Sequence, residues 1–137
     1  MTVSVLTYNI LADAYLRPEY YAEVPPAVLE PDRRRRALLE VLAGADADVL
    51  CLQEVEPEVF DHLAGRLEPL GYAGHYGQKG RGRPDGCATF VRVERFERHA
   101  ATALHYVDGA GRGGDSGHLA LMVTLETGDL ALGVANT

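Results

Sequence analysis

The spacing of apolar residues changes character about midway along the chain. In the first half, two segments with helical spacing alternate with two strand-like runs. Five further strand-like runs follow, separated by glycine-rich loops. Alternating strands and helices followed by consecutive strands are typical of α/β packing. Because the chain also contains no internal repeat and no linker, the sequence predicts that residues 1–137 form one α/β unit.

Both helical segments begin at residues that favour a helix start. Asp32 can cap the first segment, whose apolar residues share one face as far as Ala45. Pro57 and Glu58 suit the first turn of the second segment, which continues to Leu70. The predicted strands cover residues 2–8, 48–53, 72–76, 86–93, 96–106, 118–126 and 130–135, with a hairpin turn at residues 127–129.

Composition excludes several classes of protein. The chain has 47% hydrophobic residues and two cysteines, so it is neither a disordered acidic tail nor a disulfide-stapled mini-protein. Cys51 and Cys87 lie in apolar runs and are expected to be small buried residues rather than a redox pair. Residues 1–4 do not resemble a signal peptide and no apolar stretch approaches the ~20 residues of a membrane span, so we expect a cytoplasmic protein without a membrane partner.

The charge distribution allows a local basic site on an acidic chain. A net charge of −7 argues against loose, sequence-independent binding of nucleic acid. Residues 33–36 are four consecutive arginines, which we interpret as a solvated face that pairs with Glu30, Asp32 or Glu40. Lys79, Arg81 and Arg83 alternate with glycines, and this segment is either a phosphate-binding loop or simply a mobile one.

Two polar side chains occupy the carboxyl ends of the first two predicted strands. Asn9 ends the first strand and Glu54 ends the second. In an open α/β sheet the ligand crevice lies beyond these strand ends, so an amide oxygen and a carboxylate could meet there and hold a hard cation. The alternative is that Glu54 is a solvated residue at the start of the next helix.

Four ordered motifs resemble the endonuclease/exonuclease/phosphatase superfamily. They are residues 7–13, 33–39, 46–56 and 85–90, and Lys79 lies between the last two. The segments Tyr-Asn-Ile-Leu-Ala-Asp, Leu-Gln-Glu-Val and Asp-Gly-Cys-Ala most resemble the deadenylase, nocturnin and Angel branch. The resemblance implies half of a four-layer α/β/β/α sandwich, with a mixed, mainly antiparallel sheet and helices on one face.

The resemblance also implies roles for individual residues. Glu54 matches the main metal-binding glutamate of the family, and Asn9 matches the asparagine that organises the metal and the scissile phosphate. Both are therefore expected to be catalytic and to hold Mg2+, with Mn2+ as an alternative. Lys79 falls where this branch often places a basic residue that contacts substrate, and Asn136 begins the family's Asn-Thr-His-Leu segment. We expect these two residues to bind substrate.

Two further residues are candidates for substrate binding. Arg81 belongs to the basic loop that begins at Lys79. His118 follows residues 112–117, where the branch usually has a short polar segment entering a strand that lines the substrate cleft, and it stands at about the position of the branch's usual asparagine. A cleft role and a plain position at the start of a strand both remain open for His118. The other four histidines do not occupy the motifs that activate water in the family.

The chain stops directly after a predicted strand. We therefore expect residues 1–137 to be the N-terminal half of the domain, truncated before the remaining catalytic motifs. The inner faces of residues 49–52, 119–125 and 130–134 are expected to lack cover. The expected consequences are self-association, pairing with the missing C-terminal half or partial disorder.

The expected activity of the complete form is magnesium-dependent hydrolysis of phosphodiester or phosphomonoester bonds. By resemblance, the substrates are RNA 3′ ends or nucleotides. One alternative is a small-molecule nucleotide phosphatase similar to nocturnin, which the acidic net charge favours. The other is a non-catalytic binding or assembly module that retains only the metal-holding rim.

Overall fold

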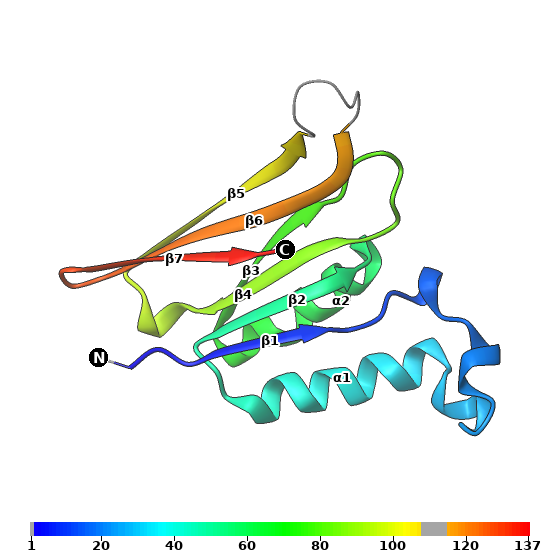
Figure 1. Ribbon diagram of the computed structural model, residues 1–137. Helices are drawn as coiled ribbons and strands as arrows, with labels where there is room; N and C mark the ends of the chain where they lie inside the picture. Colours follow the sequence, from blue (N-terminus) through cyan, green and yellow to red (C-terminus); the bar gives the residue numbers. More distant parts are fainter. Residues whose placement is uncertain (1, 108–114) are drawn as a thin grey trace.

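The structure is a computed structural model that describes residues 2–107 and 115–137 in three layers (Figure 1). Helices α1 (Pro31–Ala45) and α2 (Pro57–Leu67) cover one side of a four-stranded sheet. A three-stranded sheet packs on the other side. Both helices begin with proline at the first helical position, where its missing N–H leaves no hydrogen bond unmade.

The first sheet has the strand order β1-β2-β4-β3 and the second has the order β5-β6-β7. Among the strands of the described residues, β1 and β2 are the one parallel pair. The strand bounds are β1 Val5–Asn9, β2 Val49–Val55, β3 Tyr72–Gln78, β4 Gly86–Arg92, β5 Arg98–Val107, β6 Asp115–Thr127 and β7 Leu130–Asn136. The expected α/β class, the mainly antiparallel pairing and the helices on one face are confirmed.

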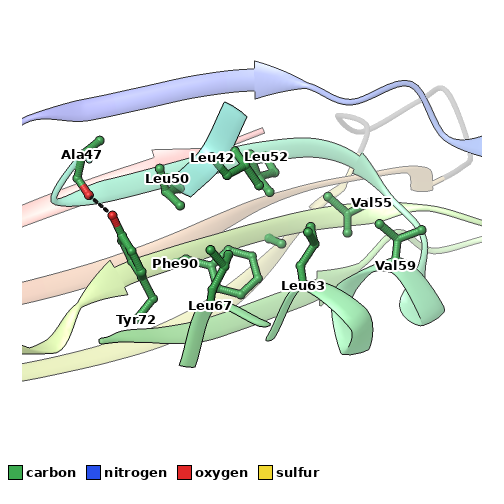
Figure 2. Packing of buried hydrophobic residues seen from close by; sticks show 11 residues of the cluster. Leu42, Ala47, Leu50, Leu52, Val55, Val59, Leu63, Leu67, Tyr72 and Phe90 are labelled. Carbon is green, nitrogen blue, oxygen red and sulfur yellow. Dashed lines mark hydrogen bonds between the residues drawn. The ribbon is translucent and has the colours of Figure 1, made fainter. Parts of the chain in front are cut away.

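One apolar core lies between the helices and the first sheet (Figure 2). Phe90 and Leu50 face it from neighbouring strands, while Leu63 and Leu67 reach it from α2. All four side chains are fully buried. The Tyr72 hydroxyl, at the margin of this core, donates a hydrogen bond of 2.7 Å to the Ala47 carbonyl, so its polar end has a partner.

A second apolar core lies between the two sheets, and it corrects the expectation of uncovered inner faces. Val49 is fully buried, and the inward-facing residues of β6, from Leu119 to Leu125, are at most 1% exposed. Strands β5 to β7 fold back across β1 to β4, so the two sheets cover each other within this chain. Only β7 fits the expectation in part, because Leu130 is 39% exposed.

The cysteines occupy this second core. Cys51 and Cys87 are both buried and unpaired, which confirms the prediction that they are small apolar residues. Burial raises the pKa of each thiol above its ordinary value. In the described part of the chain, no helix is long and apolar enough to span a membrane.

A histidine pair links the two sheets at their β3 and β5 edges. The ring nitrogens His75 Nε2 and His99 Nδ1 share a hydrogen bond of 2.8 Å. The rings meet edge to face, with centroids 5.0 Å apart. Burial and the charge of the neighbouring His99 lower the pKa of His75 below its ordinary value of 6.5.

We expect this pair to destabilise the fold in mild acid. Because the pKa of His75 is lower in the folded than in the unfolded chain, the unfolded chain binds its proton first as the pH falls through 6.5. The free energy of unfolding should therefore decrease from that pH downwards, and His75→Gln should flatten the decrease. Urea unfolding between pH 7.5 and 5 checks the effect. His62→Gln is the control. If the free energy of unfolding decreases equally steeply with pH in the wild type and in His75→Gln, the prediction is wrong.

Candidate functional site

A cleft of about 730 Å3 opens between the two sheets, at the carboxyl ends of β1 and β2. Five of the six predicted site residues line it, which brings together positions far apart in sequence. These residues are Asn9, Glu54, Lys79, His118 and Asn136. Arg81 does not line this cleft and is exposed on the basic loop.

In the described part of the chain, the Glu54 carboxylate accepts its hydrogen bonds from neutral groups. Its Oε1 accepts a hydrogen bond of 2.9 Å from Asn9 Nδ2, and its Oε2 accepts one of 3.2 Å from the backbone N–H of Ala12. No basic side chain of the described residues forms an ion pair with it. No ion pair of the described residues therefore neutralises this charge, and each oxygen retains a lone pair for a further ligand.

The backbone at this position is strained. Glu54 has a φ of 56°, and the pairing of β2 with β4 is interrupted between Gln53 and Val55. Leu11, which follows β1, has a φ of 57°. Left-handed conformations are unfavourable by about 1–2 kcal/mol for residues other than glycine, and such strain clusters at functional sites. This interruption is a β-bulge, and it points the Glu54 side chain in a direction that a regular strand would not allow.

The segment after β1 is held against the site by side chains from other elements. Asn9 Oδ1 accepts the Leu11 N–H at 2.9 Å, and Glu56 Oε2 accepts the Asp13 N–H at 2.8 Å. Arg34 forms an ion pair with Asp13 and also donates to the carbonyl oxygens of Ile10 and Leu11. Glu54, Glu56 and Arg34 thus fix the loop that surrounds the candidate metal position.

This arrangement corrects the expected pairing of the arginine run. Arg34 and Arg35 both pair with Asp13 rather than with Glu30, Asp32 or Glu40. The reason is tertiary: α1 lies alongside the segment that follows β1, so its first turn meets Asp13. The cost of placing cations at a helix start is offset by hydrogen bonds to this loop.

Lys79 lies at the edge of the cleft in an ion pair. Its Nζ is 2.6 Å from Oδ2 of Asp85, whose side chain is 0% exposed. The other oxygen of Asp85 accepts a hydrogen bond of 2.6 Å from the Tyr15 hydroxyl. The buried carboxylate is therefore paired and hydrogen-bonded on both sides, as buried charges in proteins generally are.

The remaining basic residues of this loop have different surroundings. Arg83 donates a hydrogen bond of 3.3 Å from its Nη2 to the Ser116 carbonyl, and the Gly80 N–H donates one of 2.9 Å to the Gly117 carbonyl. The loop is thus bound to the start of β6 rather than free. Among the described residues, neither Arg81 nor Arg83 has a carboxylate within ion-pair distance.

His118 and Asn136 approach the cleft from the second sheet. The His118 side chain is exposed, and residues 112–114, which precede it in the predicted polar segment, lie outside the described part. Asn136 is 2% exposed, and its Nδ2 donates to Leu52 O at 3.1 Å and Ala88 O at 2.9 Å. Its Oδ1 accepts from Gln53 Nε2 at 2.7 Å. Asn136 thus links the sheets, and its substrate role stays a prediction.

Sequence reasoning assigned no role to Asp85, Tyr15 or Gln53. Asp85 was part of a recognised motif, and its position directly before a glycine and a buried strand was the available signal. Gly86 is needed there, because a side chain would collide with the Gly77 backbone. No local signal marked Tyr15, whose partner is 70 residues away.

Comparison with known proteins places this geometry in a family. Residues 6–126 match the sequence model of the Endonuclease/Exonuclease/phosphatase family. The chain is 40% identical over 101 residues to carbon catabolite repressor protein 4 homolog 2 of Arabidopsis thaliana, which covers 68% of this chain and 17% of that protein. It is 33% identical over 115 residues to the CCR4-Not complex 3′-5′-exoribonuclease subunit Ccr4 of Saccharomyces cerevisiae. This match covers 77% of this chain and 14% of Ccr4.

Solved structures agree with this relationship. ANGEL2, described as a 2′,3′-cyclic phosphatase, superposes on this chain with a TM-score of 0.87 and a sequence identity of 29%. The superposition covers 98% of this chain and 40% of the ANGEL2 chain. The human nocturnin catalytic domain superposes with a TM-score of 0.76 and a sequence identity of 26%, and the match covers 97% of this chain and 48% of the nocturnin chain. The chain thus spans under a fifth of the two curated relatives and under half of these solved chains. It belongs to the Endonuclease/Exonuclease/phosphatase family, within the deadenylase, nocturnin and Angel branch.

Proposed function

We propose that this chain forms the metal-holding part of the active site of a magnesium-dependent phosphoesterase that acts on RNA 3′ ends or nucleotides. One observation carries the proposal. The Glu54 carboxylate faces the cleft without a cationic partner among the described residues, held by Asn9 and by the Ala12 N–H. A charge held in this way and left uncompensated is suited to a cation.

The donor set fits Mg2+ better than a softer metal. In the described residues, no group of three or more His, Cys, Asp or Glu side chains is gathered to hold a metal. Mg2+ is commonly bound by one or two carboxylates, with water and substrate phosphate completing its octahedron. Glu54 would hold the ion, and Asn9 would orient that carboxylate and offer its remaining amide-oxygen lone pair. Mn2+ accepts the same oxygen ligands.

The residues around Glu54 have distinct tasks in this proposal. When bound, the cation polarises a phosphoryl oxygen and neutralises developing negative charge. Lys79 donates hydrogen bonds to a phosphate oxygen from one edge of the cleft, and His118 faces the substrate from the other sheet. Asn136 keeps the two sheets in register behind them. A base for the attacking water is not among the assigned residues, so the proposal gives this chain the metal-holding half of the chemistry.

The similar proteins leave three substrate classes to compare. Ccr4 is described as a 3′-5′-exoribonuclease and ANGEL2 as a 2′,3′-cyclic phosphatase, while the net charge of −7 favours a small nucleotide over a long polyanion. The complete protein should be assayed with oligoadenylate, with RNA ending in a 2′,3′-cyclic phosphate and with a nucleotide monophosphate ester. Hydrolysis that depends on magnesium supports the proposal. Binding without hydrolysis of any of the three would favour a non-catalytic module.

We expect the basic loop to contribute through two different effects. Replacing Lys79, Arg81 and Arg83 with alanine should raise KM for a polynucleotide and flatten its salt dependence. The charge of Lys79 is already balanced by Asp85, whereas Arg81 and Arg83 form no ion pair with a carboxylate of the described residues, so the two arginines should carry most of the salt dependence. The slope of log(kcat/KM) against log[salt] should become less negative by up to about 0.7 for each arginine that contacts a phosphate of single-stranded RNA.

The measurement is kcat/KM on oligoadenylate between low and moderate salt. Arg66→Ala is a matched control, because Arg66 is an exposed arginine on α2 and does not line the cleft. If the double variant with Arg81→Ala and Arg83→Ala has the same slope of log(kcat/KM) against log[salt] as the wild type, the loop does not contact the substrate backbone.

A further inference from the structure

We infer that Tyr15 and Asp85 are positioning residues that fix the Lys79 ammonium at the edge of the cleft and tie it to the loop that surrounds Glu54. The inference deepens the proposed function and rests on it, because it concerns how that site holds a phosphate group.

The central group is the Asp85 carboxylate. It is 0% exposed, with Lys79 Nζ at 2.6 Å on Oδ2 and the Tyr15 hydroxyl at 2.6 Å on Oδ1. Hydrogen bonds to an ionised carboxylate are short and roughly twice as strong as neutral ones. The Lys79 side chain is 13% exposed, so little solvent competes for its position. One ammonium proton points at Asp85, and two remain for other acceptors.

The loop that carries Lys79 and Asp85 is closed at its base. The Lys79 N–H donates to the Asp85 carbonyl at 3.1 Å. Gln78 Nε2 donates to the carbonyl oxygens of Arg83 at 2.8 Å and Asp85 at 2.9 Å. Gln78 is held in turn by the Tyr76 hydroxyl at 2.8 Å. These contacts fix where the loop starts and ends, and Tyr15 supplies a contact from a different part of the chain.

Tyr15 belongs to the segment that Glu54 organises. It ends a short 3-10 turn, Asp13–Tyr15, and its N–H donates to the Ala12 carbonyl at 2.9 Å. The Ala12 N–H is the group that donates to Glu54. A continuous series of contacts therefore runs from the candidate metal ligand, through Ala12 and Tyr15, to Asp85 and Lys79. Two groups that would act on the same phosphate are thus held at a fixed separation.

The protonation of Tyr15 agrees with a donor role. Its hydrogen bond to Asp85 and its partial burial raise the pKa of the Tyr15 hydroxyl above its ordinary value of 10.0, although Arg83 opposes the shift. The hydroxyl therefore keeps its proton across the working range of pH. Because Lys79 and Asp85 together carry no net charge, Lys79 acts by directing hydrogen-bond donors rather than by adding positive potential.

Lys79 is the only lysine within residues 1–137, which helps a direct test. In the complete protein labelled with 13C and 15N in its lysine side chains, the NMR signal that disappears in Lys79→Arg belongs to Lys79 and reports the order of its ammonium group. We expect an ordered Lys79 in the wild type. In Tyr15→Phe we expect its order parameter to fall towards the values below about 0.6 that are typical of flexible groups. Asp85→Asn should have at least as large an effect.

Tyr20→Phe is the matched control, because Tyr20 lies in the next 3-10 turn, is 80% exposed and loses the same hydroxyl. Inorganic phosphate, titrated with the same signal as the readout, should bind Tyr15→Phe roughly three- to tenfold more weakly than Tyr20→Phe. An equally ordered Lys79 in the two variants would overturn the inference. So would a wild-type Lys79 as mobile as free lysine, a result that needs no substitution.

Activity of the complete protein separates this inference from the proposed function. Tyr15→Phe should raise KM roughly three- to tenfold and keep kcat within about twofold, since it disturbs phosphate binding more than the chemical step. If the wild type hydrolyses none of the candidate substrates but Lys79 loosens in Tyr15→Phe, the proposed function fails and the positioning role stands. Magnesium-dependent hydrolysis with an unchanged KM in Tyr15→Phe would support the proposed function and overturn the positioning role.

Discussion

Glu54→Gln is expected to lower kcat of the complete enzyme by at least roughly 100-fold while leaving the fold intact. Glutamine keeps the size of the side chain and can still accept the Ala12 N–H, but it removes the negative charge that would hold a cation. A metal ion that stabilises charge in the transition state contributes several kcal/mol, which corresponds to this factor or more. Hydrolysis rates measured across a magnesium titration, together with thermal unfolding, check both parts.

Two further variants make this prediction specific. Glu58→Gln removes an exposed carboxylate from the first turn of α2 and should keep full activity. Glu54→Gly should lose activity like Glu54→Gln but unfold within about 1 kcal/mol of the wild type, because glycine adopts the positive φ of this position without strain. Activity of Glu54→Gln within about threefold of wild type at limiting magnesium would refute the metal assignment.

Elements with local signals were predicted to within a few residues. Asp32 was expected to cap the first helix, but this helix begins at Pro31, so Asp32 lies within its first turn and does not cap it. The second helix begins at the predicted Pro57. The apolar run from Val49 forms a buried strand, as its composition indicates. Caps, prolines and apolar periodicity act over one or two turns, so they can be read without knowledge of the tertiary fold.

Features set by long-range contacts were not predicted. The bulge at Glu54 depends on how β2 pairs with β4, and the pairing of Arg34 with Asp13 depends on where α1 lies. The same reason explains why the inner sheet faces were wrongly expected to lack cover. Periodicity shows that alternate residues of β6 are apolar, but it does not show which sheet will pack against them.

The candidate site combines both kinds of information. Asn9 and Glu54 were expected to meet because parallel strands end at the same edge of a sheet, and β1 and β2 are the parallel pair. The role of Asp85 was not foreseen, because its partners come from a loop and from a turn distant in sequence. Motif resemblance identified the segment that contains Asp85, and only the fold shows what its carboxylate binds.

Phe90→Ala is expected to destabilise the protein by about 3–5 kcal/mol, the largest effect on stability among the core residues of the first sheet. Phe90 is fully buried in the core beneath the helices (Figure 2). It stacks with Phe60, with ring centroids 5.6 Å apart. Its ring also lies over Gly74, the residue opposite it on β3. Urea unfolding measures the loss directly.

The contact with Gly74 turns this prediction into a double-mutant cycle. A Cβ at position 74 would lie 2.7 Å from Phe90 Cε1, so Gly74→Ala alone should be destabilising. In a Phe90→Leu background the obstructing ring is absent, and Gly74→Ala should cost about 1 kcal/mol less. Gly65→Ala is the control, since nothing lies within 4 Å of its Cβ position and alanine favours a helix. Additive effects of Gly74→Ala and Phe90→Leu would show that the ring does not require glycine opposite it. Strand β4 begins directly after Asp85 and runs into this core. Coupling between Gly74→Ala and Phe90→Leu would therefore identify the packing of Phe90 on Gly74 as a contact that holds β4 in place beside the cleft.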